Sequence, residues 1–344
     1  MLGGGVFVTQ NKVLPGSYIN IVNASKATST LGERGAVAIA LPLGKSVGSV
    51  ITVTNLEFVQ NAEELLGLDA VDDEMVVLRE IFCNANKVYV YDLGIEGDKT
   101  VADACAALEP YDFNVLCAYT GETEDITSYV TQVKTWRDNM GKKCQVVVYN
   151  HDGDHEGVIN VVSTVEDGDA HALVAWVAGA LAGAKVNESC TNKLYNGELK
   201  VVCDKTQTQL EECLGKGEFV LHLVYGEVRV LEDINSLTTF TDDKGEDFKY
   251  NQTIRVIDQI ANDIAKLFNT KYLGKIPNNK SGRVSLWGDI VAHHRQMEDI
   301  QAIENFDSNL LTVERGVDKK SVVVYDYVTP MNAMAQLYMT LVIQ

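Results

Sequence analysis

The sequence lacks a long hydrophobic run, an excess of basic residues and any closely spaced pair of cysteines. Its longest stretch of small apolar residues, at 172–184, is too short to cross a bilayer, so we expect no membrane insertion by this chain. The formal net charge of -19 opposes binding to the phosphate backbone of nucleic acids. Seven cysteines without a CxxC spacing are typical of small buried side chains in a reducing cytoplasm, not of a disulfide framework.

What the sequence does contain is sufficient for a substantial folded core. Its 344 residues include 46% hydrophobic and 22% charged residues, which excludes a mainly disordered chain and allows two or three packed units. The first residues, Met-Leu-Gly-Gly-Gly-Val-Phe-Val, lack the basic flank and long apolar region of a signal peptide. We therefore expect a protein that is made in the cytoplasm and leaves it only by lysis.

The middle of the chain alternates between apolar strand patterns and amphipathic helix patterns. After two β-rich runs within 35–53, the predicted strands are 87–92, 113–119, 144–149, 158–163, 199–203 and 219–225. The predicted helices are 55–66, with Asn55 as its cap, 72–84, 101–108, 125–140, 170–181 and 206–214. This alternation predicts the α/β fold class, with a mainly parallel sheet that is covered on both faces.

The pattern changes after residue 231, which we interpret as the start of a second, α+β unit. A polar loop is followed by predicted helices at 256–268 and 285–300 and by strands at 310–314 and 322–328. The predicted organisation is an N-terminal arm (1–24), an outer α/β domain (25–235), an inner α+β domain (236–330) and a C-terminal strand arm (331–344).

Both ends of the chain have the pattern of single β-strands that need a sheet to pair with. The residues at 336–344 favour a strand, whose apolar face consists of Leu337, Met339, Leu341 and Ile343. Near the start, glycines and Pro15 isolate short strands within 6–22. The partner sheet belongs either to the same subunit or to a neighbouring one, and from composition alone the same subunit is favoured.

One strand-to-helix turn has part of the pattern of a phosphate-binding loop. The segment 93–100, Leu-Gly-Ile-Glu-Gly-Asp-Lys-Thr, follows a strand and leads into a helix. A phosphate loop needs glycine directly before the lysine, but here Asp98 stands in that place, and its charge opposes an anion. A plain connecting turn is therefore the better interpretation.

The histidines offer candidate metal ligands. The segment 151–156, His-Asp-Gly-Asp-His-Glu, follows a strand end, where α/β enzymes place their sites. Its residues are contiguous in one loop, so a solvated acidic turn is a better interpretation than a metal site. His293 and His294 are adjacent on a predicted helix and cannot share a metal in the i, i+4 manner. We predict no catalytic residue, no cofactor and no metal.

Several short segments at the two ends of the chain carry a resemblance to a known family. Near the start they are Asn-Lys-Val-Leu-Pro-Gly-Ser-Tyr-Ile-Asn (11–20), Gly-Glu-Arg-Gly (32–35) and Ala-Leu-Pro-Leu-Gly (40–44). Near the end they are Ser-Gly-Arg (281–283), Ala-Ile-Glu-Asn-Phe (302–306) and Met-Asn-Ala-Met-Ala-Gln-Leu-Tyr-Met (331–339). Together they resemble the tail sheath protein of contractile phage tails, in particular the XkdK-like group of defective prophages and tail-derived bacteriocins. The chain departs from longer members in lacking the extra β-domain that follows a strand like 88–92.

The resemblance implies a structural subunit without catalysis. Such subunits form a helical homopolymer of stacked six-fold rings around an inner tail tube, with baseplate and tail terminator proteins as further partners. Contraction drives the tube through a cell envelope, and the particle assembles in the bacterial cytoplasm and is released by lysis. The alternative is a cytoplasmic α/β enzyme or nucleotide-binding protein that uses the turns at 94–100 and 151–156.

The resemblance also implies that both terminal strands complete sheets in adjacent subunits, which reverses the preference from composition. The implied strand-addition residues are Val13, Pro15, Tyr18, Ile19 and Ile21 near the start, and Leu337, Tyr338, Met339, Leu341 and Ile343 near the end.

Overall fold

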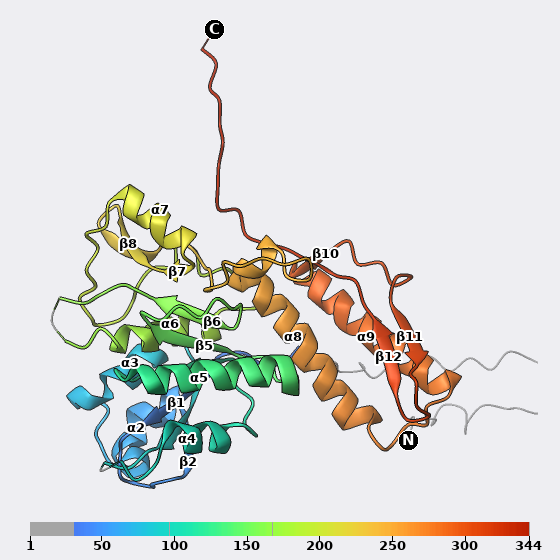
Figure 1. Cartoon of the computed structure of the whole chain (residues 1–344), viewed down its shortest axis with the longest axis horizontal. Coiled ribbons are helices and arrows are strands. Elements are labelled where there is room, and N and C mark those ends of the chain that lie inside the picture. Colours follow the sequence, from blue (N-terminus) through green and yellow to red (C-terminus); the bar gives the residue numbers. More distant parts are fainter. Residues whose placement is uncertain (1–30, 96, 167, 344) are drawn as a thin grey trace, which may run out of the picture.

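The largest element of the computed structural model is a seven-stranded sheet with the strand order β2-β3-β1-β4-β5-β6-β7 (Figure 1). The structure describes residues 31–95, 97–166 and 168–343. The strands are β1 (Ala36–Leu41), β2 (Val50–Thr54), β3 (Lys87–Asp92), β4 (Val115–Cys117), β5 (Gln145–Tyr149), β6 (Val158–Val161) and β7 (Glu218–Phe219). All neighbouring strands of this sheet are parallel except the edge strand β2, which runs antiparallel to β3. The predicted mainly parallel sheet is confirmed.

Helices cover both faces of this sheet, because its strands are apolar on both sides. In β1, Val37 and Ile39 face α2, α3 and α6, whereas Ala38 and Ala40 face α4 and α5. The helices of this unit are α2 (Asn55–Leu66), α3 (Val76–Phe82), α4 (Val101–Leu108), α5 (Thr123–Thr135), α6 (Ala172–Gly183) and α7 (Gln207–Gly215).

The small-apolar run found in the sequence forms α6, which is buried on nearly all sides. Its glycines allow close packing on α3: a Cβ atom at Gly179 would lie 2.4 Å from the carbonyl oxygen of Ile81. Within the described ranges, no helix combines the length and the apolar character that a membrane span requires. The run therefore serves the core of the sheet unit.

The part of the chain after the large sheet, which we call the second unit for its position in the sequence, contains two long helices, α8 (Asn251–Leu267) and α9 (Lys280–Asp299). Helix α8 lies between the sheet unit and α9 (Figure 1). Its apolar residues Val256 and Ile260 pack with Ile290 and Met297 of α9. Four short strands follow: β10 (Ile303–Glu304), β11 (Thr312–Arg315), β12 (Val322–Tyr325) and β13 (Thr329–Pro330).

Several predicted elements differ from those in the structure. The predicted strand 199–203 is wrong, since this segment makes only an isolated bridge between Val201 and Val165. The predicted strand 219–225 splits into β7 and β8 (Leu221–Val224), because β8 leaves the large sheet to pair with β9 (Glu227–Val230). Tyr225 and Gly226 join β8 to β9 with φ values of 51° and 86°, a two-residue turn that matches the twist of a hairpin.

The cap of α2 and the start of α9 also differ from the prediction, and side-chain hydrogen bonds explain both differences. The cap of α2 is Thr54 and not Asn55, because the Thr54 hydroxyl accepts a hydrogen bond from the Glu57 amide and Glu57 bonds back to Thr54. Helix α9 begins at Lys280, earlier than predicted, because the Asn279 side chain accepts a hydrogen bond from the Gly282 amide.

Candidate functional site: the C-terminal arm and its root

The C-terminal segment leaves the body of the protein from a defined root. Strand β13 pairs antiparallel with β10, and the Met331 amide then donates to the Ala302 carbonyl over 3.0 Å. Two further contacts hold the chain against the start of α8. The Ala333 amide donates to Oε1 of Gln252 over 2.9 Å, and the Thr253 hydroxyl donates to Oδ1 of Asn332 over 3.1 Å.

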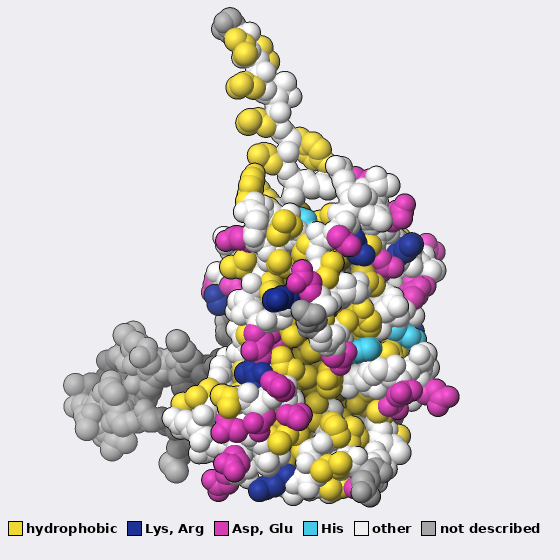
Figure 2. Space-filling view, turned by 90° about the vertical axis from the view of Figure 1, so that its left-hand side faces the viewer, with side chains coloured by type: hydrophobic (Ala, Val, Ile, Leu, Met, Phe, Trp, Pro, Cys, Tyr) yellow, Lys and Arg dark blue, Asp and Glu magenta, His cyan; other side chains and the backbone are white. Residues whose placement is uncertain are grey.

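Beyond this root the chain projects from the body as an extended arm, which we define as residues 334–343 (Figure 1). Its apolar side chains are exposed, with Leu337 at 85%, Leu341 at 79% and Ile343 at 89% of their full area. Figure 2 shows hydrophobic side chains along the arm. No residue of the arm belongs to a strand of the described chain. Exposed apolar segments of this kind are common at sites of interaction between chains, so the arm is a candidate for such a site.

A second surface offers sheet edges to which a strand can be added. Strands β11 and β12 form a two-stranded antiparallel sheet that packs on α9, where the Trp287 indole donates to the Leu311 carbonyl over 3.0 Å. Within the described chain this sheet has no further strand on either side. In β12, Val323 and Val324 are each 37% exposed and Tyr325 is 56% exposed. Unpaired backbone groups next to apolar side chains are a template for strand addition.

Helix α8 carries the root of the arm and is fixed to the sheet unit by buried ion pairs. The Arg137 guanidinium donates to both oxygens of Asp258, over 2.6 and 2.9 Å. Arg255, one turn earlier on α8, donates to Asp233 over 3.2 Å. Burial lowers the pKa of Arg137, but the attraction of Asp258 and Glu156 outweighs this effect and raises it overall. The guanidinium therefore stays charged, and its two hydrogen bonds to Asp258 link α8 to the sheet unit.

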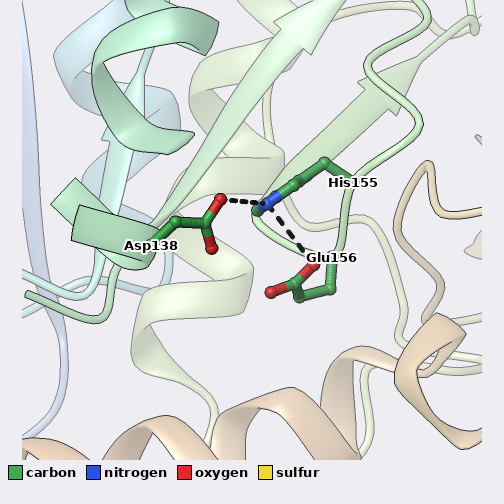
Figure 3. A group of neighbouring side chains, drawn as sticks. All are labelled: Asp138, His155 and Glu156. Carbon is green, nitrogen blue, oxygen red and sulfur yellow. Dashed lines mark hydrogen bonds and ion pairs between the residues drawn. The ribbon is translucent and has the colours of Figure 1, made fainter. Parts of the chain in front are cut away.

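One group of potential metal ligands lies beside this junction: Asp138, His155 and Glu156 (Figure 3). The Nε2 atom of His155 lies 3.3 Å from Oδ2 of Asp138 and 3.5 Å from Oε2 of Glu156. His155 and Glu156 are buried, so the predicted solvated turn is wrong for these two residues.

Cationic side chains explain this burial. The ammonium group of Lys244 lies 3.0 Å from both oxygens of Glu156, and Arg137 lies 3.7 Å from the same carboxylate. Burial, aided by these two cations, lowers the pKa of His155 despite the attraction of Glu156. Lys244 and Arg137 thus balance the charge of Glu156, and the cluster has the contacts of an ion-pair network.

The turn after β3 is filled by the protein's own carboxylate. Asp92 accepts hydrogen bonds from the amides of Leu43, Gly44, Ser46 and Gly94 over 2.6–3.2 Å. Burial alone would raise the pKa of Asp92, but these four donors lower it overall. Asp92 thus ties the loop after β1 to the first amide of this turn, and the Thr100 amide at the other end donates to the Asp103 carboxylate, so the turn has the structure of a plain connection.

The structure places the sequence-predicted assembly residues as follows. Leu337, Tyr338, Met339, Leu341 and Ile343 all lie in the exposed arm. Val13, Pro15, Tyr18, Ile19 and Ile21 lie outside the described residues. Sequence reasoning predicted strands near β11 and β12 but gave them no role. The run of valines at 322–324, which breaks the usual polar alternation of an exposed strand, was the available signal.

The described chain thus combines an α/β sheet fold with an exposed apolar arm at its C-terminal end. Comparison with known proteins then shows the family. The model of the phage tail sheath protein central domain matches residues 94–236, and that of the phage tail sheath C-terminal domain matches residues 243–344. The chain belongs to the phage tail sheath family.

Curated relatives agree with this assignment. The phage-like element PBSX protein XkdK of Bacillus subtilis is 26% identical, with 98% of this chain and 99% of the relative aligned. That alignment runs over 462 positions, compared with 344 residues in this chain, so the relative has many positions without a counterpart here. The tail sheath protein of Clostridium phage phiCD119 is 31% identical, with 65% of this chain and 62% of that protein aligned. These relatives are structural sheath proteins and not enzymes.

Solved structures share the fold. The sheath tail protein from Desulfitobacterium hafniense is 28% identical and superimposes with a TM-score of 0.79, covering 93% of this chain and 98% of that one. The contracted helical sheath of the anti-feeding prophage has a TM-score of 0.71 at 16% identity, covering 96% of this chain and 99% of that one.

Proposed function

We propose that this chain polymerises by lending its C-terminal arm to the sheet of a neighbouring copy. The observation that carries the proposal is the arm itself, an extended segment of exposed β-forming residues in a member of the sheath family. Strand addition pairs its backbone groups and removes its apolar side chains from water. Val13, Pro15, Tyr18, Ile19 and Ile21 act in the same way at the other end of the chain.

The receiving site is the β11–β12 sheet of the neighbour. Its free edges supply unpaired amides and carbonyls, and the exposed Val323 and Val324 supply apolar contacts for alternate residues of the arm. A two-stranded sheet is marginally stable by itself, so an added strand benefits both partners. Because donor and acceptor are different surfaces, the contact is head-to-tail and propagates into a helix instead of closing a dimer.

The assembly is a helical tube of stacked six-fold rings around an inner tube, and it contracts to drive that tube through a cell envelope. The baseplate of the anti-feeding prophage contains a chain of the same fold, and its sheath is described in a contracted helical state. The further partners are the inner tail tube, the baseplate and the tail terminator protein. The particle assembles in the bacterial cytoplasm and leaves by lysis as a phage tail or bacteriocin.

Electron microscopy of the purified full chain and of a variant without residues 334–344 tests this proposal. We expect tubes or rings from the full chain, and folded single subunits from the truncated one, since the arm contributes nothing to the core. A matched control replaces Tyr225 and Phe240, two exposed aromatic residues outside the arm, by serine. Normal tubes from the truncated chain, or a loss of tubes in the control, would contradict the proposal.

A further inference from the structure

His293 and His294 form a buried pair between two carboxylates. Their Nδ1 atoms lie 3.2 Å apart, and the residues are 1% and 0% exposed. The Nε2 atom of His293 lies 3.0 Å from Oδ2 of Asp263 on α8. The Nε2 atom of His294 lies 2.7 Å from Oδ2 of Asp326, which follows β12. From the helix geometry alone we expected the two side chains to point in different directions, but in the structure their Nδ1 atoms face each other.

The protons in this chain of contacts can be counted. An ionised carboxylate only accepts hydrogen bonds, so each Nε2 atom carries a proton. The two Nδ1 atoms make a hydrogen bond at 3.2 Å only when one of them also carries a proton. We infer that His293 and His294 hold one extra proton between them, so that the pair carries a single positive charge balanced by Asp263 and Asp326.

This shared proton connects the roots of both ends of the chain. Oδ1 and Oδ2 of Asp263 also accept from the Gly32 amide, over 3.1 and 3.2 Å, and Gly32 leads directly into the N-terminal segment. Asp326 lies just before β13, which anchors the C-terminal arm. When the extra proton leaves, two lone pairs face each other in a buried site, which breaks the chain of contacts. The pair therefore couples the two roots, a role that rests on the proposed function of the arms.

Charged groups from several elements act on the pair. Asp326 contacts His294, and the charged residues that line the cleft beside His293 are Asp263 and Lys266 of α8 together with Glu33, Arg34, Lys87 and Asp112. His293 is among the residues that line this cleft, which has a volume of about 840 Å³.

A metal ion is the competing occupant. The Nδ1 separation also suits two ligands of one tetrahedral ion at about 2.0–2.1 Å each, and carboxylates on the far nitrogens commonly orient such ligands. Among the described residues, however, no third ligand atom joins the two Nδ1 atoms. The arrangement of the two rings therefore favours a shared proton over a bound metal ion.

Nitrogen-15 NMR of the full chain labelled at its six histidines tests the inference. Solid-state spectra serve equally for polymers and single subunits, so the result is independent of the proposed assembly. At neutral pH we expect protonated Nε2 atoms in both rings and a through-space contact from one protonated Nδ1 to the other. Two rings without any Nδ1 proton would overturn the inference, as would a metal-type shift of both Nδ1 signals that stoichiometric Zn²⁺ produces and a chelator removes.

The coupling is tested with Asp326→Asn, which keeps an acceptor but removes one balancing charge. We expect the occupancy of the shared proton at neutral pH to fall several-fold, and hydrogen exchange of the Gly32 amide to speed up about tenfold. Asp307→Asn, at an exposed carboxylate that accepts from the Asn309 amide, is the control and should change neither readout. Faster exchange near residue 326 with an unchanged Gly32 amide would overturn the coupling.

Discussion

Arg137 and Asp258 join the two units of the protein through a two-point ion pair in which both side chains are nearly buried, at 2% and 10% exposure. Arg137 belongs to the short helical turn after α5, and Asp258 lies in the middle of α8. A force on the arm reaches α8 first, because Gln252 and Thr253 hold the arm root. The pair is therefore a direct link between the helix that holds the arm root and the sheet unit.

Replacing Asp258 by asparagine leaves the Arg137 charge buried with only the more distant Glu156 to balance it. We expect the free energy of unfolding to fall by about 3–5 kcal/mol, the usual cost of breaking a buried pair. The control is Glu198→Gln, which breaks an exposed pair with Arg79 and should cost less than about 1 kcal/mol. Urea unfolding followed by circular dichroism measures both, and equal losses would show that burial is not decisive.

Gly179 is expected to tolerate no side chain, because its Cβ position lies 2.4 Å from the backbone oxygen of Ile81. Gly179→Ala should therefore destabilise the protein by about 1–3 kcal/mol through overpacking. Gly288→Ala is the matched control in another helix, where a Cβ atom meets nothing within 4 Å. It should be neutral or stabilise by about 0.5–1 kcal/mol, since alanine suits a helix better than glycine. A destabilised control with an unaffected Gly179→Ala would reverse the argument.

Acid should weaken the fold in two steps. The lowered pKa of the buried His155 means that the unfolded chain takes up a proton first, so stability falls as the pH drops below about 6.5. Burial alone would raise the pKa of Asp154, but hydrogen bonds from Thr239 and Thr238 lower it to about 2. Its contribution is present above about pH 4 and is lost as the pH falls toward 2.

Part of the second step can be removed by a single substitution. Asp154→Asn should make the dependence of the unfolding free energy on pH less steep below about 4, while Asp92, whose pKa is also lowered, keeps its share and the first step stays in place. Asp242→Asn, which removes an exposed carboxylate, is the control. Thermal unfolding recorded from pH 7 to pH 2 gives the comparison, and an unchanged acid limb in Asp154→Asn would refute the assignment.

The two faces of the arm should differ in their tolerance of charge. Met339→Glu with Leu341→Glu places charges on the face that also carries Leu337 and Ile343, and we expect at least a tenfold loss of sedimentable polymer. Thr340→Glu with Val342→Glu charges the opposite face and should reduce assembly less. All four positions are exposed, so the subunit should fold normally in both variants. Equal loss from both variants would argue against the pairing of one face with a sheet.

The sheet unit followed from the sequence because periodicity is a local property. Strands such as Lys87–Asp92 and helices such as Val101–Leu108 carry their own apolar patterns and caps. The predictions that were wrong concern elements whose structure depends on contacts with distant parts of the chain. The pattern at 199–203 favours a strand, but no neighbouring edge receives it beyond the bridge at Val201. The split between β7 and β8 depends on a hairpin partner that lies beyond the turn at Tyr225.

The C-terminal arm could be predicted from the sequence, whereas the buried charged clusters could not. An apolar alternating run near residue 340 needs no other part of the chain to be recognised. The burial of His155 and Glu156 depends on Lys244 and Arg137, which lie far away in the sequence. The contact between His293 and His294 likewise depends on Asp263 and Asp326 drawing the outer nitrogens apart. Local sequence patterns do not predict contacts between charged residues that lie far apart in the chain.

The exposed arm also creates a risk of aggregation before assembly. On the proposed function, each newly made copy carries an exposed apolar segment through which wrong partners can join it in irregular aggregates. The strongly acidic body opposes this, since mutual repulsion keeps free copies apart. Raising the salt concentration during purification should therefore promote aggregation, because salt screens the repulsion between copies but does not weaken the apolar contacts of the arm.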